Sequence, residues 1–284
     1  MSRMPTGARF AASSASDPQS ARAAEAARVV VATVALRSGG RRMRQGRLGQ
    51  YGFRHLAGRA VDRFVYPLTP KRHALALRFV RWAWIMRWEP EVSRIRDYAR
   101  PGVALDVGAN MGLWSYAMAR TGLFREILAF EPNTALTEDL SHAQLPGLRL
   151  IHKAVSAAAG TSELRIPLKG RARLDGWASL EQQIDLDADS FERRTIETIR
   201  LDDLALTNVS FVKIDVEGHE LNVLAGARQL FSESRPTCIL EFRDRNRDAV
   251  LDFFHGLGVG YAVVDTRSKY GFDLSPGNIL MAVA

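Results

Sequence analysis

The chain of 284 residues is long enough for one large domain, or for one domain of ordinary size with an N-terminal extension. Its content of 46% hydrophobic and 25% charged residues is typical of a globular protein and excludes global disorder. The single cysteine, Cys238, excludes an intramolecular disulfide and a cysteine metal cluster, and it fits a reducing, cytoplasmic location.

Positive charge is concentrated at the N-terminal end of the chain. Residues 1–100 contain 20 Lys and Arg against 6 Asp and Glu, whereas the remainder contains 19 basic and 25 acidic residues. Such asymmetry is typical of a segment that meets an anionic surface or an acidic partner, and equally of a solvated Arg-rich surface. We therefore expect a basic, partly helical N-terminal extension over residues 1–75. Peripheral contact with an anionic membrane is one interpretation of this region, and nucleic acid is not an expected partner.

The N-terminal extension has no pattern of a membrane span. Residues 1–20 are rich in Ser, Ala, Pro and Arg, and residues 21–36 are Ala-rich with high helix propensity. The apolar run at 29–36 is shorter than the roughly 20 residues that cross a bilayer, and its flanks lack a signal-peptide order. A helix is predicted over residues 75–88, where arginines alternate with bulky apolar residues.

Short apolar runs alternate with helix-like stretches after Pro101. This alternation predicts a doubly wound α/β domain over residues 76–284, with a mostly parallel sheet covered by helices on both faces. The last two runs are predicted to form an antiparallel C-terminal hairpin at the edge of the sheet. The predicted strands are 103–108, 126–131, 148–155, 209–216, 237–242, 261–265 and 278–284.

A glycine turn follows the first predicted strand in LDVGANMG, residues 105–112. Gly108 and Gly112 let the backbone approach a ligand, and the helix that follows directs free N–H groups toward it. The G-x-x-x-G spacing departs from the dinucleotide fingerprint. Asp106 at the strand end would repel a pyrophosphate and attract the ammonium and sulfonium groups of S-adenosylmethionine. We therefore expect Asp106, Gly108, Asn110 and Gly112 in a binding site for S-adenosylmethionine.

A second acidic residue ends the next strand, in ILAFEPN. Because one helix and one strand separate Glu131 from Asp106, both carboxylates are expected at the carboxyl ends of adjacent strands. A carboxylate in that position can accept hydrogen bonds from both ribose hydroxyls of a cofactor. A surface glutamate before a proline turn is the structural alternative.

Acidic residues and a histidine follow the strand at 209–216. Asp215, Glu217 and His219 are expected at the sheet edge where ligands bind in open α/β folds. A hydroxyl acceptor must lose a proton, for which His219 has the natural pKa and Asp215 the better expected position. A divalent cation held by Asp215 and Glu241 is the alternative. The metal-free mechanism is favoured because the sequence does not show that the carboxylates converge.

Taken in chain order, these segments resemble the FkbM-type methyltransferase family. The matching segments are LDVGANMG, FEPN, KAVS at 153–156, TIRLDDL, FVKIDVEGHELNVLAGA and LEF at 240–242. The resemblance implies a Rossmann-like class I methyltransferase fold, with S-adenosylmethionine as cofactor and Ser156 of KAVS beside it. It also implies O-methylation of a hydroxyl on a sugar, glycan or secondary metabolite.

Two other functions stay open at this point. A nicotinamide-dependent oxidoreductase would share the strand and glycine turn, but the glycine spacing and the absence of a Tyr-x-x-x-Lys pair argue against it. A non-catalytic cofactor-binding or anchoring module would leave the function to the basic N-terminal region. The polar segment 169–194 is individual to this chain, so the acceptor stays open as well.

Overall fold

The computed structural model describes residues 65–86, 89–182 and 187–283. The elements predicted over residues 1–64 lie outside these ranges, and the anionic membrane contact expected there stays a prediction. Within the described ranges, no helix is both long and apolar enough to cross a membrane.

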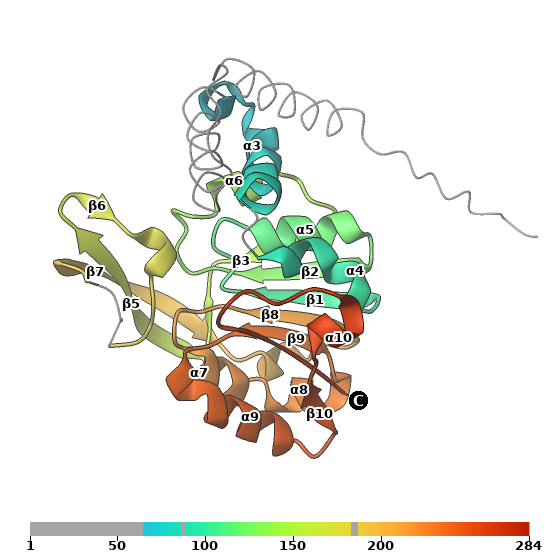
Figure 1. Cartoon of the computed structure of the whole chain (residues 1–284). Coiled ribbons are helices and arrows are strands. Elements are labelled where there is room, and N and C mark those ends of the chain that lie inside the picture. Colours follow the sequence, from blue (N-terminus) through green and yellow to red (C-terminus); the bar gives the residue numbers. More distant parts are fainter. Residues whose placement is uncertain (1–64, 87–88, 183–186, 284) are drawn as a thin grey trace, which may run out of the picture.

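A seven-stranded sheet forms the centre of the molecule (Figure 1). Its strands are β1 (Gly102–Val107), β2 (Phe124–Phe130), β3 (Leu148–Ile151), β8 (Val209–Ile214), β9 (Thr237–Glu241), β10 (Tyr261–Val263) and β11 (Asn278–Val283). Their order is β10-β11-β9-β8-β1-β2-β3. The pairs from β9 to β3 are parallel, and β11 is antiparallel to both β9 and β10. The predicted doubly wound sheet with an antiparallel C-terminal pair is therefore confirmed.

Helices cover both faces of this sheet (Figure 1). One face carries α3 (Lys71–Phe79), α4 (Ile95–Tyr98), α5 (Leu113–Thr121), α6 (Glu138–His142) and α10 (Thr266–Tyr270), and the other carries α7 (Glu220–Ala225), α8 (Arg228–Ser234) and α9 (Arg247–His255). Successive residues of each strand point to opposite faces of the sheet and so contribute to the hydrophobic cores on both faces. Leu105 and Val212 pack with the residues of α7, α8 and α9, whereas Phe211 packs with Trp114 and Met118 of α5.

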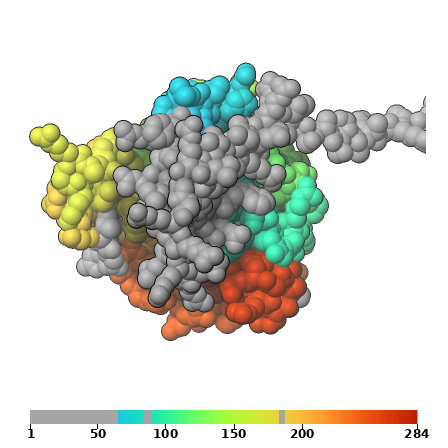
Figure 2. All heavy atoms as spheres, turned by 45° about the horizontal axis from the view of Figure 1, so that its top comes forward, coloured from blue at the N-terminus to red at the C-terminus, as the bar shows by residue number. Residues whose placement is uncertain are grey.

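A second sheet of four strands stands beside the first, as a lobe at the side of the body (Figure 2). Its strands are β4 (Ala154–Val155), β5 (Gly160–Lys169), β6 (Ala172–Arg173) and β7 (Ser190–Ile199), in the order β4-β7-β5-β6. The predicted single strand at 148–155 is wrong, because the chain leaves the central sheet after β3 and enters the second sheet at β4. The antiparallel pair of β5 and β7 was not predicted, since most of its side chains are polar and partly exposed.

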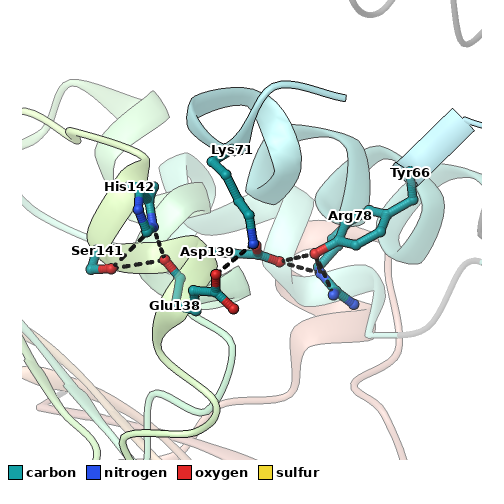
Figure 3. Close-up of polar contacts among 7 residues, drawn as sticks. All are labelled: Tyr66, Lys71, Arg78, Glu138, Asp139, Ser141 and His142. Atoms are coloured by element: carbon teal, nitrogen blue, oxygen red, sulfur yellow. Dashed lines mark hydrogen bonds and ion pairs between the residues drawn. The ribbon is translucent and has the colours of Figure 1, made fainter. Parts of the chain in front are cut away.

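Polar contacts connect α3 and the turn before it to α6 (Figure 3), and an apolar contact adds to them. Asp139 of α6 accepts a hydrogen bond of 2.5 Å from the hydroxyl of Tyr66 and forms an ion pair with Arg78. Leu75 is fully buried beside Leu140 of α6. Tyr66 and Leu75, which fall within the extension predicted over residues 1–75, therefore pack directly on the α/β domain, whereas Arg78 falls within the domain predicted over residues 76–284.

Candidate active site

An open cleft lies at the carboxyl ends of β1, β2 and β8. The segment 175–180, between β6 and β7, forms another part of its wall. Six of the residues predicted from the sequence line this cleft: Gly108, Asn110, Glu131, Asp215, Glu217 and His219. The other four, Asp106, Gly112, Ser156 and Glu241, are not among its lining residues.

The glycine turn is packed tightly between the end of β8 and helix α6. Gly108 has a φ of +79°, and a Cβ atom there would lie 1.8 Å from the carbonyl oxygen of Asp215. At Gly112, with a φ of +83°, a Cβ atom would lie 2.5 Å from Leu140 Cδ1. The amides of Gly108 and Ala109 donate to the carbonyl of Phe130 and so are directed at β2. Only glycine fits both positions, and Gly108 and Asn110 of the turn line the cleft.

Glu131 lies at the end of β2, in the place expected for a ribose acceptor. Its Oε2 accepts a hydrogen bond from the amide of Asn110 and its Oε1 accepts one from the amide of Asn133, both at 2.8 Å. Burial raises the pKa of this carboxyl to about 7, against the lowering effect of the two amides. Each carboxylate oxygen keeps a further lone pair for a ligand donor. Asn133, the last residue of the FEPN segment, helps to hold Glu131 in place, and the sequence analysis did not single it out.

Asp106 lies beneath the glycine turn, on the face of the sheet covered by α5. It is 1% exposed, and its Oδ2 accepts a hydrogen bond of 2.6 Å from Ser115 Oγ. Burial raises the pKa of this carboxyl to about 6, while Ser115 and Lys213 lower it. The side chain therefore anchors α5 below the turn, and its charge acts on the cleft without lining it.

Glu217 is held on the opposite side of the cleft by a strained turn. Its φ of +53° is in the left-handed region, and its carbonyl accepts a hydrogen bond of 2.8 Å from Ser179 Oγ. Burial, with a further contribution from Asp215, raises the pKa of the Glu217 carboxyl to about 7. The carboxyl is thus poised between its acid and base forms near neutral pH.

Asp215, which follows β8, and Glu241, which ends β9, have their carboxyl groups in contact with each other. Burial first, and then Asp215, raises the pKa of Glu241 to about 8. Asp215 Oδ2 also lies 3.4 Å from Nζ of Lys213, a residue that the sequence analysis did not single out. Among the described residues, no group of three or more His, Cys, Asp or Glu side chains is arranged to hold a metal ion.

His219 connects the two sheets through both of its ring nitrogens. Nε2 lies 2.9 Å from Ser156 Oγ, just after β4, and Nδ1 lies 2.7 Å from Glu181 Oε1, directly after the segment 175–180 that walls the cleft. The structure thus brings together Ser156, expected at the cofactor, and His219, expected at the acceptor. Glu181 was missed because the polar segment around it has no recognisable spacing.

The fold and the cleft together define a Rossmann-like α/β protein of the class I methyltransferase type. The methyltransferase FkbM domain model matches residues 106–262, which is more than half of the chain. The chain therefore belongs to this family. A curated relative, methyltransferase sdnD of Sordaria araneosa, is 26% identical over 205 residues, which cover 60% of this chain and 73% of the relative.

Solved structures of methyltransferases are also similar to this chain. Methyltransferase FkbM from Methylobacillus flagellatus has 14% identity and a TM-score of 0.43, and the match covers 79% of this chain and 60% of that one. An rRNA methylase from Streptococcus thermophilus has 11% identity and a TM-score of 0.41, with 68% of this chain and 94% of that one covered. The chain thus spans less than two thirds of the length of the Methylobacillus protein.

Proposed function

We propose that this chain transfers the methyl group of S-adenosylmethionine to a hydroxyl group of a sugar, glycan or secondary metabolite. The observation that carries the proposal is the arrangement of the cleft. The glycine turn follows β1, Glu131 follows β2 on one side of it, and Asp215 and Glu217 follow β8 on the other. Membership of the FkbM family supports methyl transfer over the nicotinamide-dependent alternative.

The cofactor side of the cleft offers acceptors for a ligand with several donor groups. Asn110 Oδ1 is buried and has no hydrogen-bond partner among the described residues, although Asn110 lines the cleft. A buried polar atom without a partner is costly and indicates a group that a ligand completes. Together with the Glu131 carboxylate, Asn110 fits the hydroxyl and ammonium donors of S-adenosylmethionine.

The acceptor side offers a base. When bound, S-adenosylmethionine would supply a methyl group on a sulfonium; in-line attack of the acceptor oxygen on that methyl carbon would break the C–S bond and release the cofactor as a thioether. Glu217 takes the proton of the acceptor hydroxyl, because its carboxyl faces the cleft and has a pKa of about 7. Asp215 lies beside it at the strand end and orients the acceptor. His219, the alternative base, would first have to give up its contact with Ser156.

The test combines cofactor binding with turnover. We expect Glu131→Gln to weaken S-adenosylmethionine binding by about 1.5 to 3 kcal/mol in calorimetry, since it removes a charged acceptor. The matched control is Glu126→Gln, at the other end of β2, where Glu126 pairs with Arg149. Unchanged affinity in Glu131→Gln would contradict the assignment of the cofactor site.

Turnover is measured by transfer of a labelled methyl group to sugar and metabolite hydroxyls, analysed by mass. A product gaining one methyl group supports the proposal. Normal cofactor binding without transfer to any acceptor would favour the non-catalytic module. Inhibition by a chelator, reversed by a divalent cation, would replace Glu217 as activating group with a metal at Asp215 and Glu241.

A further inference from the structure

A segment beside the second sheet crosses to the strand ends of the central sheet. Residues 174–181, which we call the strap, lie between β6 and β7. Two backbone hydrogen bonds between Arg165 and Ser179, of 2.9 and 3.1 Å, join the strap to β5. The strap residues that line the cleft are Asp175, Gly176, Ala178 and Leu180. The cleft therefore has strand ends of the central sheet in one wall and the strap in another.

Side-chain hydrogen bonds connect the strap to the chain after β2 and after β8. Asn133 Nδ2 donates a hydrogen bond of 2.9 Å to Asp175 Oδ1. Ser179 Oγ donates one of 2.8 Å to the carbonyl oxygen of Glu217. Because Asn133 also holds Glu131, the strap is attached next to the residue expected at the cofactor ribose.

The strap also meets the glycine turn after β1. A Cβ atom at Gly176 would lie 3.5 Å from Asn110 Nδ2, which is an ordinary contact distance, and both residues line the cleft. Asn110 Oδ1 is buried and has no hydrogen-bond partner among the described residues. Since a buried oxygen without a partner is costly, we expect a ligand donor to complete it. A ligand in that position would contact the turn and the strap together.

The last residue of the strap is held by a chain of three side chains. Glu181 Oε1 lies 2.7 Å from Nδ1 of His219, and Nε2 of the same ring lies 2.9 Å from Ser156 Oγ. A carboxylate only accepts hydrogen bonds, so Nδ1 is the donor, and Nε2 of a neutral ring then accepts from the Ser156 hydroxyl. The carbonyl of His219 accepts hydrogen bonds from the amides of Asn222 and Val223 at the start of α7. His219 is thus fixed to the central domain, and Glu181 attaches the strap to it.

We propose that the strap is the second wall of the cofactor site and encloses S-adenosylmethionine, and that Glu181 is a positioning residue that holds the strap in place through His219. This inference rests on the proposed function. A ligand that contacts both walls binds the closed arrangement better than an open one, so the ligand and the strap stabilise each other. Individual side-chain hydrogen bonds are of modest strength, so the loss of the bond to Glu181 should let the strap open more often and release the cofactor faster.

The first test places a side chain between the two walls. Gly176 has no left-handed φ, and a Cβ atom there makes an ordinary contact, so Gly176→Val should fold. We expect it to weaken binding of S-adenosylhomocysteine, the cofactor without its methyl group, by about tenfold or more in calorimetry, because the added side chain crowds the bound ligand. Ala172→Val is the matched control, since it adds bulk on exposed β6, outside the cleft.

The second test concerns the attachment through Glu181. Glu181→Ala should speed the dissociation of S-adenosylhomocysteine by roughly tenfold in stopped flow, and Glu181→Gln, which keeps an acceptor oxygen, should restore part of the wild-type rate. Glu163→Gln on β5 is the control, because it changes only an exposed pair with Arg193 and should keep that rate. A role in stability alone would lower the unfolding midpoint of Glu181→Ala and leave the dissociation rate unchanged.

Amide hydrogen exchange of the full-length wild-type protein is the third test and needs no variant. Bound S-adenosylhomocysteine should slow exchange in the peptide that contains the strap. Binding without this protection, equal affinity of Gly176→Val and Ala172→Val, or an unchanged dissociation rate in Glu181→Ala overturns the inference and leaves the proposed function standing. If the variants fail to fold, the exchange of wild type decides. A wild-type protein that binds no S-adenosylhomocysteine contradicts both proposals, whereas strap protection together with a failed transfer screen contradicts the proposed function alone.

Discussion

Replacing Gly108 by alanine tests how closely the glycine turn packs against the end of β8. A Cβ atom at Gly108 would lie 1.8 Å from the carbonyl oxygen of Asp215, a distance that real Cβ atoms do not show. Gly271 offers a matched control, because its φ of +75° is close to the +79° of Gly108, and a Cβ atom there meets nothing within 4 Å. The two variants therefore share the backbone strain and differ in the contact.

The expected losses of stability and of cofactor affinity distinguish the backbone strain from the contact with Asp215. Alanine in the left-handed region costs about 1 to 2 kcal/mol, so Gly271→Ala should lose about that much stability and keep its cofactor affinity. In Gly108→Ala, the turn and the end of β8 must in addition move apart, because both contact atoms belong to backbone. A misplacement of about 1 Å can lower a reaction rate about 10²-fold, so contacts to a bound cofactor are also expected to be sensitive to it. We expect a larger loss of stability together with at least about tenfold weaker S-adenosylmethionine binding.

Urea denaturation and calorimetry measure both quantities on the same preparations. Equal losses of stability and unchanged cofactor affinity in the two variants would refute the reasoning, because the contact with Asp215 would then have no consequence. A branched side chain at Gly108 should be worse than alanine, since the Val216 side chain also lies 3.2 Å from the Cβ position.

Two further predictions concern charge. The pKa of Glu217 is raised from an ordinary 4.5 to about 7, so its contribution to stability is present below the lower value and is lost as pH rises through the higher one. As the pH rises from 4.5 to about 7, the Glu217→Gln protein should therefore lose less stability than wild type, as measured by thermal unfolding. The same pH dependence in both proteins would count against the raised pKa. Arg78→Met should cost about 1.5 to 3 kcal/mol in urea denaturation, because it leaves buried Asp139 without its cation. Lys71→Met removes only the exposed pair with Glu138 and should cost about 0 to 1 kcal/mol; equal costs would contradict this distinction.

The central sheet could be predicted because its strands are buried on both faces. Runs such as VSFVKIDV and TCILEF are nearly continuous apolar segments, and each is fully or largely buried in the structure. The position of Glu131 followed from the same logic, since one helix and one strand after Asp106 bring the chain to the adjacent strand end. Burial of this kind leaves a clear mark in the sequence.

The second sheet and the contacts of His219 could not be predicted for the opposite reason. β5 and β7 are held mainly by backbone hydrogen bonds to each other, and exposed or half-buried side chains carry no apolar period. Glu181 meets His219 only through the fold, because 38 positions separate them. Lys213 did leave a signal, a positive charge in the middle of a run predicted to be a buried strand, but the sequence analysis considered only the residues at the strand ends.

The attachment of α3 to α6 connects α3 to the glycine turn. Helix α6 has only 5 residues, so few backbone hydrogen bonds hold it in place by itself. Tyr66 and Arg78 bind α6 through a hydrogen bond and an ion pair with Asp139. The next residue of α6, Leu140, lies against Gly112. Through Asp139 and Leu140, the position of α3 is therefore tied by direct contacts to Gly112 of the glycine turn. Among the described residues, α3 therefore supports the glycine turn although none of its own residues lines the cleft.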